Sequence, residues 1–358
     1  MSTLPSALPL DGRLPWLEPL QRALDSALQS DRVGHALLLQ VSPGLGGEWL
    51  ATWLAARLFC TQLREREYTV GAAPLRSPCG ECLACRRVQT DEQPDLMVLR
   101  PIEDSREIRI DQVRELLSEL TLTSHAGGRK LAIITPADKL NRAAANALLK
   151  TLEEPTSGSL LVLVTGEPSR LPVTVLSRCT RLQRPPPSSA ELLEWLQQHT
   201  GGQKADWEAV LQVLGAKPLE AMTADTHALA QLQRDTVRAL EQAAAGSLDP
   251  VETAESWGKD DYALRVVCIE SWLIGRIRAW ARGSGGGLGG GPSGGLGDSV
   301  GGASADRRVQ TLFLALEETR EARQWADTPI NKPLALERLL WRLNSLASGS
   351  AAPSRRPA

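Results

Sequence analysis

Four cysteines that lie close together in the sequence are the residues best suited to bind a metal ion. Cys79, Cys82 and Cys85 form a CxxCxxC pattern, and Cys60 precedes them. Four thiolates are a ligand set of tetrahedral zinc sites, and a site with four protein ligands is structural because it leaves no position for a substrate. We therefore expect one structural zinc ion here; the alternative is a group of free, reduced cysteines.

A glycine-rich segment stands between the first predicted strand and a helix, where nucleotide-binding domains place a phosphate-binding loop. In the pattern GxxxxGK[ST], the lysine neutralises the β- and γ-phosphates and the hydroxyl group binds Mg²⁺. Here Val41 takes the place of the first glycine, Gly47 that of the lysine and Glu48 that of the hydroxyl residue, while Gly44 and Gly46 remain in the turn. A carboxylate repels phosphate, so we expect no ATP binding; the alternative is an ordinary glycine-rich turn.

The acidic residues of an ATPase are also incomplete. An active enzyme of this type places two carboxylates after its third strand, one for Mg²⁺ and one to polarise water. The strand predicted over Lys130–Ile134 is followed by Thr135, Pro136, Ala137 and Asp138, so that Asp138 alone is present and is displaced from the strand end. Two separate parts of a catalytic site are therefore degenerate.

Composition limits the classes of protein to which the chain can belong. It has 358 residues, 42% of them apolar, and a formal net charge of −2, which predicts two or three packed domains and disfavours a dedicated nucleic-acid-binding protein. No apolar run approaches the roughly 20 residues of a membrane span, and the N-terminal residues lack the pattern of a secretion signal. We expect a soluble cytoplasmic protein without disulfides.

Alternating strands and helices over residues 33–180 predict an α/β domain with a parallel sheet. The expected strands are Ala36–Gln40, Asp95–Leu99, Lys130–Ile134 and Leu160–Val164, and the clearest helix is Asn141–Glu154. After the prolines at 185–187 only helices are predicted, among them Asp260–Arg282 and Ala305–Trp325. The expected divisions are an α/β domain at 1–184 with a cysteine module at about 60–85, a small helical domain at 185–225, a second helical domain at 226–347 with a flexible glycine-rich insert at 283–302, and a disordered tail at 348–358.

Two motifs give the chain a specific resemblance. The segment Asn141–Pro155, NRAAANALLKTLEEP, and the tripeptide Ser177-Arg178-Cys179 resemble the signature helix and the SRC motif of the clamp-loader subunits of bacterial DNA polymerase III, which are AAA+ proteins. Residues 331–340 extend the resemblance weakly toward the C-terminus. It implies a phosphate-loop NTPase-like (AAA+) α/β domain, a helical lid and a helical collar domain for oligomerisation.

The degenerate ATP site separates this chain from the gamma/tau motor subunits of that family, which keep an intact phosphate loop. It is similar instead to the delta-prime branch, and no arginine stands near 215–218, where motor subunits place a phosphate-sensing arginine. The resemblance implies a non-hydrolysing subunit that helps load the sliding clamp onto primed DNA, with gamma/tau, delta and the beta clamp as partners. The assembly as a whole is a DNA-directed DNA polymerase.

Arg178 is the residue that the resemblance identifies as active. It implies that Arg178 reaches across a subunit boundary toward ATP held by a neighbouring motor subunit, where a guanidinium stabilises charge on the transferring phosphoryl group. Ser177 is expected to fix the turn and Cys179 to pack in the interior. The alternative for Arg178 is an ordinary surface arginine beside a strand end.

Two other functions stay open. An ATP-hydrolysing loader subunit would need the lysine and hydroxyl that positions 47 and 48 lack. A free-standing zinc-containing nucleic-acid-binding protein is disfavoured by the acidic balance of the chain. Ten tryptophans suggest base stacking, but we expect Trp272, Trp280 and Trp341 to lie in helical cores.

Overall fold

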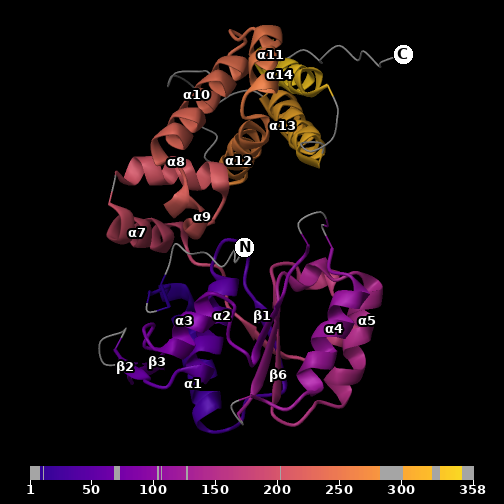
Figure 1. The fold of residues 1–358 in the computed structure, drawn as a ribbon. Helices are drawn as coiled ribbons and strands as arrows, with labels where there is room; N and C mark the ends of the chain where they lie inside the picture. The colour runs from indigo at the N-terminus through magenta and orange to yellow at the C-terminus, as the bar shows by residue number, and fades with distance from the viewer. Residues whose placement is uncertain are drawn as a thin grey trace. The chain divides into compact units, whose positions relative to one another are not determined.

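The computed structural model describes residues 9–10, 12–67, 73–102, 105, 107–125, 128–201, 203–282, 301–324 and 331–348, without the side chains of 301–307. The chain forms two compact units: Met1–Leu192 with Lys217–Leu219, and Leu193–Ala216 with Glu220–Ala358. The first is an α/β unit and the second is helical (Figure 1). Within the described residues, no helix is both long enough and apolar enough to cross a membrane.

A five-stranded parallel sheet forms the centre of the α/β unit. Its order is β4-β5-β6-β1-β7. After β1 the chain therefore crosses to the far edge strand β4, and it returns through β5 to β6, which pairs with β1. The central strands are continuous apolar runs because helices cover both faces of the sheet. The strands are β1 (Ala36–Gln40), β4 (Leu96–Leu99), β5 (Lys130–Ile134), β6 (Ser159–Thr165) and β7 (Thr180–Gln183).

The predicted fold class is confirmed: a parallel sheet of the phosphate-loop NTPase type precedes an all-helical region. All four predicted strands are present, two of them with the predicted bounds. Strand β7 was not predicted. It lies at the edge of the sheet and most of its side chains are exposed, so it lacks the apolar run by which the other strands are recognised.

Helices pack on each face of this sheet. On one face lie α4 (Ile110–Thr121) and α5 (Arg142–Glu153), side by side (Figure 1). The predicted α5 is confirmed: the Asn141 side chain accepts a hydrogen bond from the Ala144 N–H at 2.8 Å and so caps its N-terminus. Leu148 and Leu152 of its apolar stripe are buried in the core beneath it. On the other face lie α1 (Glu18–Gln29) and α2 (Gly47–Phe59).

Short elements complete the α/β unit. A two-stranded antiparallel hairpin and a short helix follow α2, and the cysteines lie just after α2, just after β3 and at the start of α3. The elements are η1 (Pro15–Leu17), β2 (Arg64–Arg66), β3 (Leu75–Ser77), α3 (Leu83–Gln89), η2 (Ala137–Lys139), η3 (Pro168–Arg170) and α6 (Val173–Leu176).

The remaining helices lie in the second unit, except that the first residues of α7 and α9 belong to the α/β unit. A core around Leu240, Trp257, Ile269 and Leu340 holds its C-terminal part together. The helices are α7 (Ser189–Thr200), α8 (Lys204–Leu214), α9 (Pro218–Thr223), α10 (Thr226–Ala244), α11 (Pro250–Lys259), α12 (Tyr262–Ala281), α13 (Gly301–Gln324) and α14 (Lys332–Ser348).

Several expectations for this unit need correction. The predicted flexible insert at 283–302 is wrong at its last two residues, which begin α13, since glycine in a helix costs only about 1 kcal/mol per residue relative to alanine. The predicted disordered tail at 348–358 is wrong at Ser348, which ends α14, since sequence does not locate a helix end to the residue. Residues 283–300 and 349–358 lie outside the described residues. Trp280 and Trp341 are nearly half exposed, because an apolar helical stretch does not indicate which of its side chains face outward; Trp272 packs against the core.

Candidate functional site

The segment Val41–Glu48, which we call the degenerate loop, leads from β1 directly into α2. Gly44 and Gly46 have φ angles of 78° and 90°, the left-handed conformation that glycine adopts without strain. Both glycines of this turn therefore have backbone conformations that residues with a Cβ atom rarely adopt.

Gly47, at the lysine position, has little space for a side chain. A Cβ atom added there would lie 3.0 Å from Val164 Cγ1 and 3.1 Å from Val41 Cβ, which is closer than carbon atoms pack without strain. Val41 stands where the ATPase pattern has its first glycine. The two departures from the pattern are therefore linked in space, since the valine at 41 occupies room that a lysine at 47 would need.

Apolar and long side chains also cover the outer side of the degenerate loop. A Cβ atom at Gly46 would lie 2.5 Å from Leu14 Cδ1, and one at Gly44 would lie 2.5 Å from Lys217 Cβ. The Trp16 indole donates a hydrogen bond to the Leu45 carbonyl oxygen at 2.8 Å. None of these covering residues was predicted, because they lie far away in the sequence and carry no motif.

Two carboxylates lie near the ends of the central strands, and each accepts a hydrogen bond from a threonine. Glu48 Oε1 accepts from Thr135 Oγ1, just beyond β5, at 2.8 Å. Asp138 Oδ1 accepts from Thr165 Oγ1, the last residue of β6, also at 2.8 Å. The sequence-predicted Asp138 thus lies in η2 and contacts β6, whereas the carboxylate beside the end of β5 is Glu48 of the degenerate loop.

Two cavities lie near these residues. One, of about 10 Å³, is bounded by Glu48, Thr135 and Arg100 and has room for no more than a single water molecule. The other is an open hollow of about 450 Å³ at the carboxyl ends of β1, β6 and β7. Arg184 is the one charged residue among those that line it, so it offers no carboxylate to a Mg²⁺ ion.

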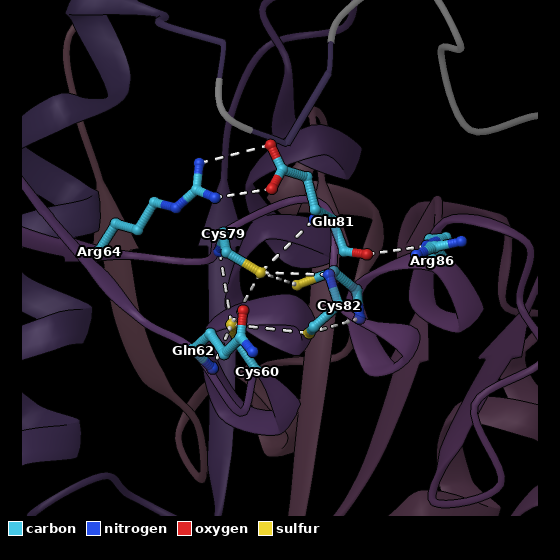
Figure 2. Close-up of polar contacts among 8 residues, drawn as sticks. Cys60, Gln62, Arg64, Cys79, Glu81, Cys82 and Arg86 are labelled. Atoms are coloured by element: carbon cyan, nitrogen blue, oxygen red, sulfur yellow. Dashed lines mark hydrogen bonds and ion pairs between the residues drawn. The ribbon is translucent and has the colours of Figure 1, made fainter.

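The four predicted cysteines converge, and we call them the cysteine cluster (Figure 2). Cys60 directly follows α2 as its C-cap, Cys79 follows β3, Cys82 caps α3 and Cys85 lies in its first turn. Their sulfur atoms all lie within 4.8 Å of one another, and three of the S–S distances are 3.6, 3.9 and 3.9 Å. Four sulfurs placed about 2.3 Å from a tetrahedral ion would be separated by about 3.8 Å, so the cluster has the dimensions of a metal site.

Backbone N–H groups stabilise negative charge in the cysteine cluster. The sulfur of Cys79 accepts from the amides of Glu81 and Cys82 at 3.5 and 3.3 Å, and that of Cys60 accepts from Gln62 and Cys79 at 3.4 Å each. Burial raises the pKa of Cys82, but hydrogen bonds from the Cys85 amide and from Thr61 together have a larger, opposite effect. The resulting pKa is about 6. Thiolates are the form in which cysteine binds metal.

Charged residues brace the turn between Cys79 and Cys82. Glu81 pairs with Arg64 of β2 at 2.7 Å, and its carbonyl oxygen accepts a hydrogen bond from Arg86 Nε at 2.8 Å (Figure 2). Gly80 has a φ of 80°, so the reversal between the two cysteines needs a residue without a Cβ. Spacing alone grouped the four cysteines, but it did not predict these supporting contacts.

The SRC motif lies at the end of α6. Arg178 Nη2 forms an ion pair with Glu153 Oε1 of α5 at 2.6 Å, and Nη1 donates to the Thr174 carbonyl oxygen at 3.1 Å and to Ser177 Oγ at 3.3 Å. Cys179 packs against the α/β core, and burial raises its pKa to about 11. The arginine is therefore held at the surface by contacts that its sequence motif alone did not reveal.

Comparisons with known proteins agree with the motifs. A family model described as DNA polymerase III, delta subunit, matches residues 17–188. DNA polymerase III subunit delta' of Pseudomonas aeruginosa is 32% identical over 93% of this chain and 97% of its own length. DNA polymerase III subunit tau/gamma of Haemophilus influenzae is 33% identical over 45% of this chain and 22% of its own length. A solved gamma subunit-related protein of Thermotoga maritima has a TM-score of 0.42 and 17% identity, over 93% of this chain and 99% of its own.

Proposed function

The chain belongs to the DNA polymerase III delta-prime subunit family, and from this we propose that it is the non-hydrolysing delta-prime subunit of a clamp-loader complex. In this role it helps load the sliding clamp onto primed DNA during replication and acts in the cytoplasm. The observation that carries the proposal is the similarity to a delta' subunit along nearly the whole of both chains. Its partners would be gamma/tau motor subunits, a delta subunit and the beta clamp, with DNA contacted through the complex.

The degenerate loop supports the absence of ATP hydrolysis. A nucleotide would need a lysine where a Cβ atom at Gly47 would crowd Val164 and Val41, and it would meet a carboxylate at Glu48 where Mg²⁺ needs a hydroxyl. Leu14 and Lys217 pack against the glycines that would have to approach the phosphates. The obstruction is thus steric as well as electrostatic, which argues against an ATP-hydrolysing gamma/tau-type subunit.

The position of Arg178 supports a role in a neighbouring active site. Its side chain is 35% exposed, and Val173, the first residue of the short α6 that precedes it, is 76% exposed although it is apolar. An exposed apolar residue and an accessible arginine at the two ends of one short segment are suited to an interface between subunits. We therefore assign Arg178 as a trans arginine finger, with Ser177 and Cys179 holding its turn.

The cysteine cluster fits a zinc ion, with Cys60, Cys79, Cys82 and Cys85 as ligands. Bound zinc would link the end of α2 to the β2-β3 hairpin and α3, and with four protein ligands it would supply no catalytic chemistry. The lid at 185–225 and the collar at 226–347 complete the proposed organisation, with the collar as the part that assembles with the other subunits.

The proposal is tested by binding measurements on the isolated chain. We expect no saturable binding of ATP in the presence of Mg²⁺ by equilibrium dialysis, and a stable complex with gamma/tau and delta subunits by size-exclusion chromatography. Micromolar binding of ATP by the chain alone would favour the motor-subunit alternative. Salt-sensitive binding of DNA by the isolated chain, without any complex formation, would favour the free-standing nucleic-acid-binding alternative.

A further inference from the structure

Glu153 lies at a position where the electrostatics of its own helix disfavour a negative charge. It is the last residue of α5, where the partial negative charge of the helix C-terminus disfavours a carboxylate. The Arg178 guanidinium, 2.6 Å away, offsets both negative charges. The position is therefore explained by its contact with the proposed finger better than by the stability of the helix.

The contact leaves part of the guanidinium available. Arg178 uses Nη2 toward Glu153 and Nη1 toward Thr174 and Ser177. Among the described residues, nothing accepts a hydrogen bond from Nε. A guanidinium carries five N–H groups, so it can stay attached to Glu153 and still present donors to an anion outside the chain.

Three acceptors from two different helices fix the plane of the guanidinium. Glu153 lies on α5, which is anchored in the core through Leu148 and Leu152, whereas Thr174 and Ser177 belong to the short α6 and its end. A one-turn helix is a weak support on its own. Glu153 therefore ties the Arg178 guanidinium to α5, which is held in the core, and this compensates for the weak support that α6 gives.

We propose that Glu153 is the positioning residue of the trans arginine finger: it holds the Arg178 guanidinium in the orientation in which its remaining N–H groups meet the phosphate of a neighbouring subunit's nucleotide. Glu153 itself touches no reacting atom. This inference rests on the proposed role of Arg178 and adds to it the residue on which its precision depends.

The test uses the complete reconstituted complex with Glu153→Gln, which keeps the size of the side chain and removes its charge. We expect single-turnover ATP hydrolysis at the site facing this chain to slow by about two- to fivefold, the rate equivalent of a partly exposed ion pair. The ATP concentration for half-maximal rate should not change. Glu154→Gln, one residue further along and exposed, is the matched control and should leave the rate unaltered.

A double-variant comparison separates positioning from a structural role. In an Arg178→Ala background, Glu153→Gln should have no further effect on the rate, because the group that it positions is gone. An equal loss in both backgrounds, or faster hydrolysis with Glu153→Gln, would overturn the inference. If Arg178→Ala leaves hydrolysis unchanged, the finger itself fails; if Arg178→Ala slows it and Glu153→Gln does not, only the positioning role fails.

A readout on the isolated chain needs no partner. Arginine side-chain NMR should show a restrained Arg178 guanidinium in the wild type and a faster-rotating one in Glu153→Gln, where only the contacts with Thr174 and Ser177 remain, while Glu154→Gln resembles the wild type. Equal rotation rates in all three proteins would contradict the inference, whatever the complex does.

Discussion

Replacement of Gly47 by alanine tests whether the degenerate loop has lost its lysine for steric reasons. Gly47 is the first residue of α2 and is not among the glycines with positive φ, so its backbone suits any residue. A Gly→Ala change in a helix ordinarily stabilises by roughly 0.5–1 kcal/mol. Here the new methyl group would lie 3.0 Å from Val164 Cγ1 and 3.1 Å from Val41 Cβ, and overpacking of this kind costs about 1–3 kcal/mol.

The two effects have opposite signs, and the steric one is larger. We therefore expect Gly47→Ala to lower the free energy of unfolding of the α/β unit by about 1–2 kcal/mol. Gly275→Ala is the matched control, because Gly275 lies inside α12 and an added Cβ would meet nothing within 4 Å. That change should stabilise the helical unit by about 0.5–1 kcal/mol.

Hydrogen exchange with mass spectrometry during urea unfolding measures the two units separately. The loss in free energy of unfolding caused by Gly47→Ala should be about 1 kcal/mol smaller in a Val41→Gly background, because the effects of residues in contact are coupled. For the same reason, Gly47→Lys with Glu48→Thr should not restore ATP binding while Val41 remains. If Gly47→Ala stabilises the α/β unit as Gly275→Ala stabilises the helical one, the steric reasoning is refuted.

Two predictions concern the cysteines. Cys85→Ser should lower the zinc content, measured by atomic absorption, well below the roughly one ion per chain expected for a four-cysteine site. Cys268→Ser removes a buried cysteine outside the cluster and should not lower it. Equal zinc in both variants would contradict the assignment. Burial raises the pKa of Cys179 to about 11, so its neutral thiol is favoured in the folded state up to that pH. Alkylation at pH 8 should therefore be about 100-fold slower than in the unfolded chain and should keep rising with pH toward about 11; a plateau near pH 9 would show that the thiol is not protected.

Sequence periodicity predicted the parts of the fold that are buried on both faces. β1, β5 and β6 contain the uninterrupted apolar runs ALLL, LAII and LLVLV, and runs this short, flanked by polar or turn residues, favour buried strands over helices. The exposed β7 and the short β2-β3 hairpin carry no such signal, because they are stabilised by contacts with elements distant in the sequence. The same applies to α13, whose first residues are glycines that composition assigns to a flexible insert.

The candidate sites divide in the same way. The spacing of the cysteines was sufficient to group four ligands, since metal geometry restricts which spacings can converge. The covering of the degenerate loop by Leu14, Trp16 and Lys217 and the pairing of Arg178 with Glu153 depend on the tertiary fold. One local signal for Glu153 did exist: a carboxylate at a helix C-terminus is unfavourable without a cationic partner.

DNA-stimulated ATP hydrolysis by the reconstituted complex tests most directly the claim that this chain completes a neighbour's active site without having one of its own. Arg178→Ala should leave assembly intact and reduce hydrolysis at the adjacent site by about 10³-fold or more, as loss of an arginine finger does in other phosphoryl-transfer enzymes. Arg181→Ala, which removes an exposed arginine of β7, is the matched control and should not change the rate. Unchanged hydrolysis with Arg178→Ala in a complex of verified composition would contradict the account.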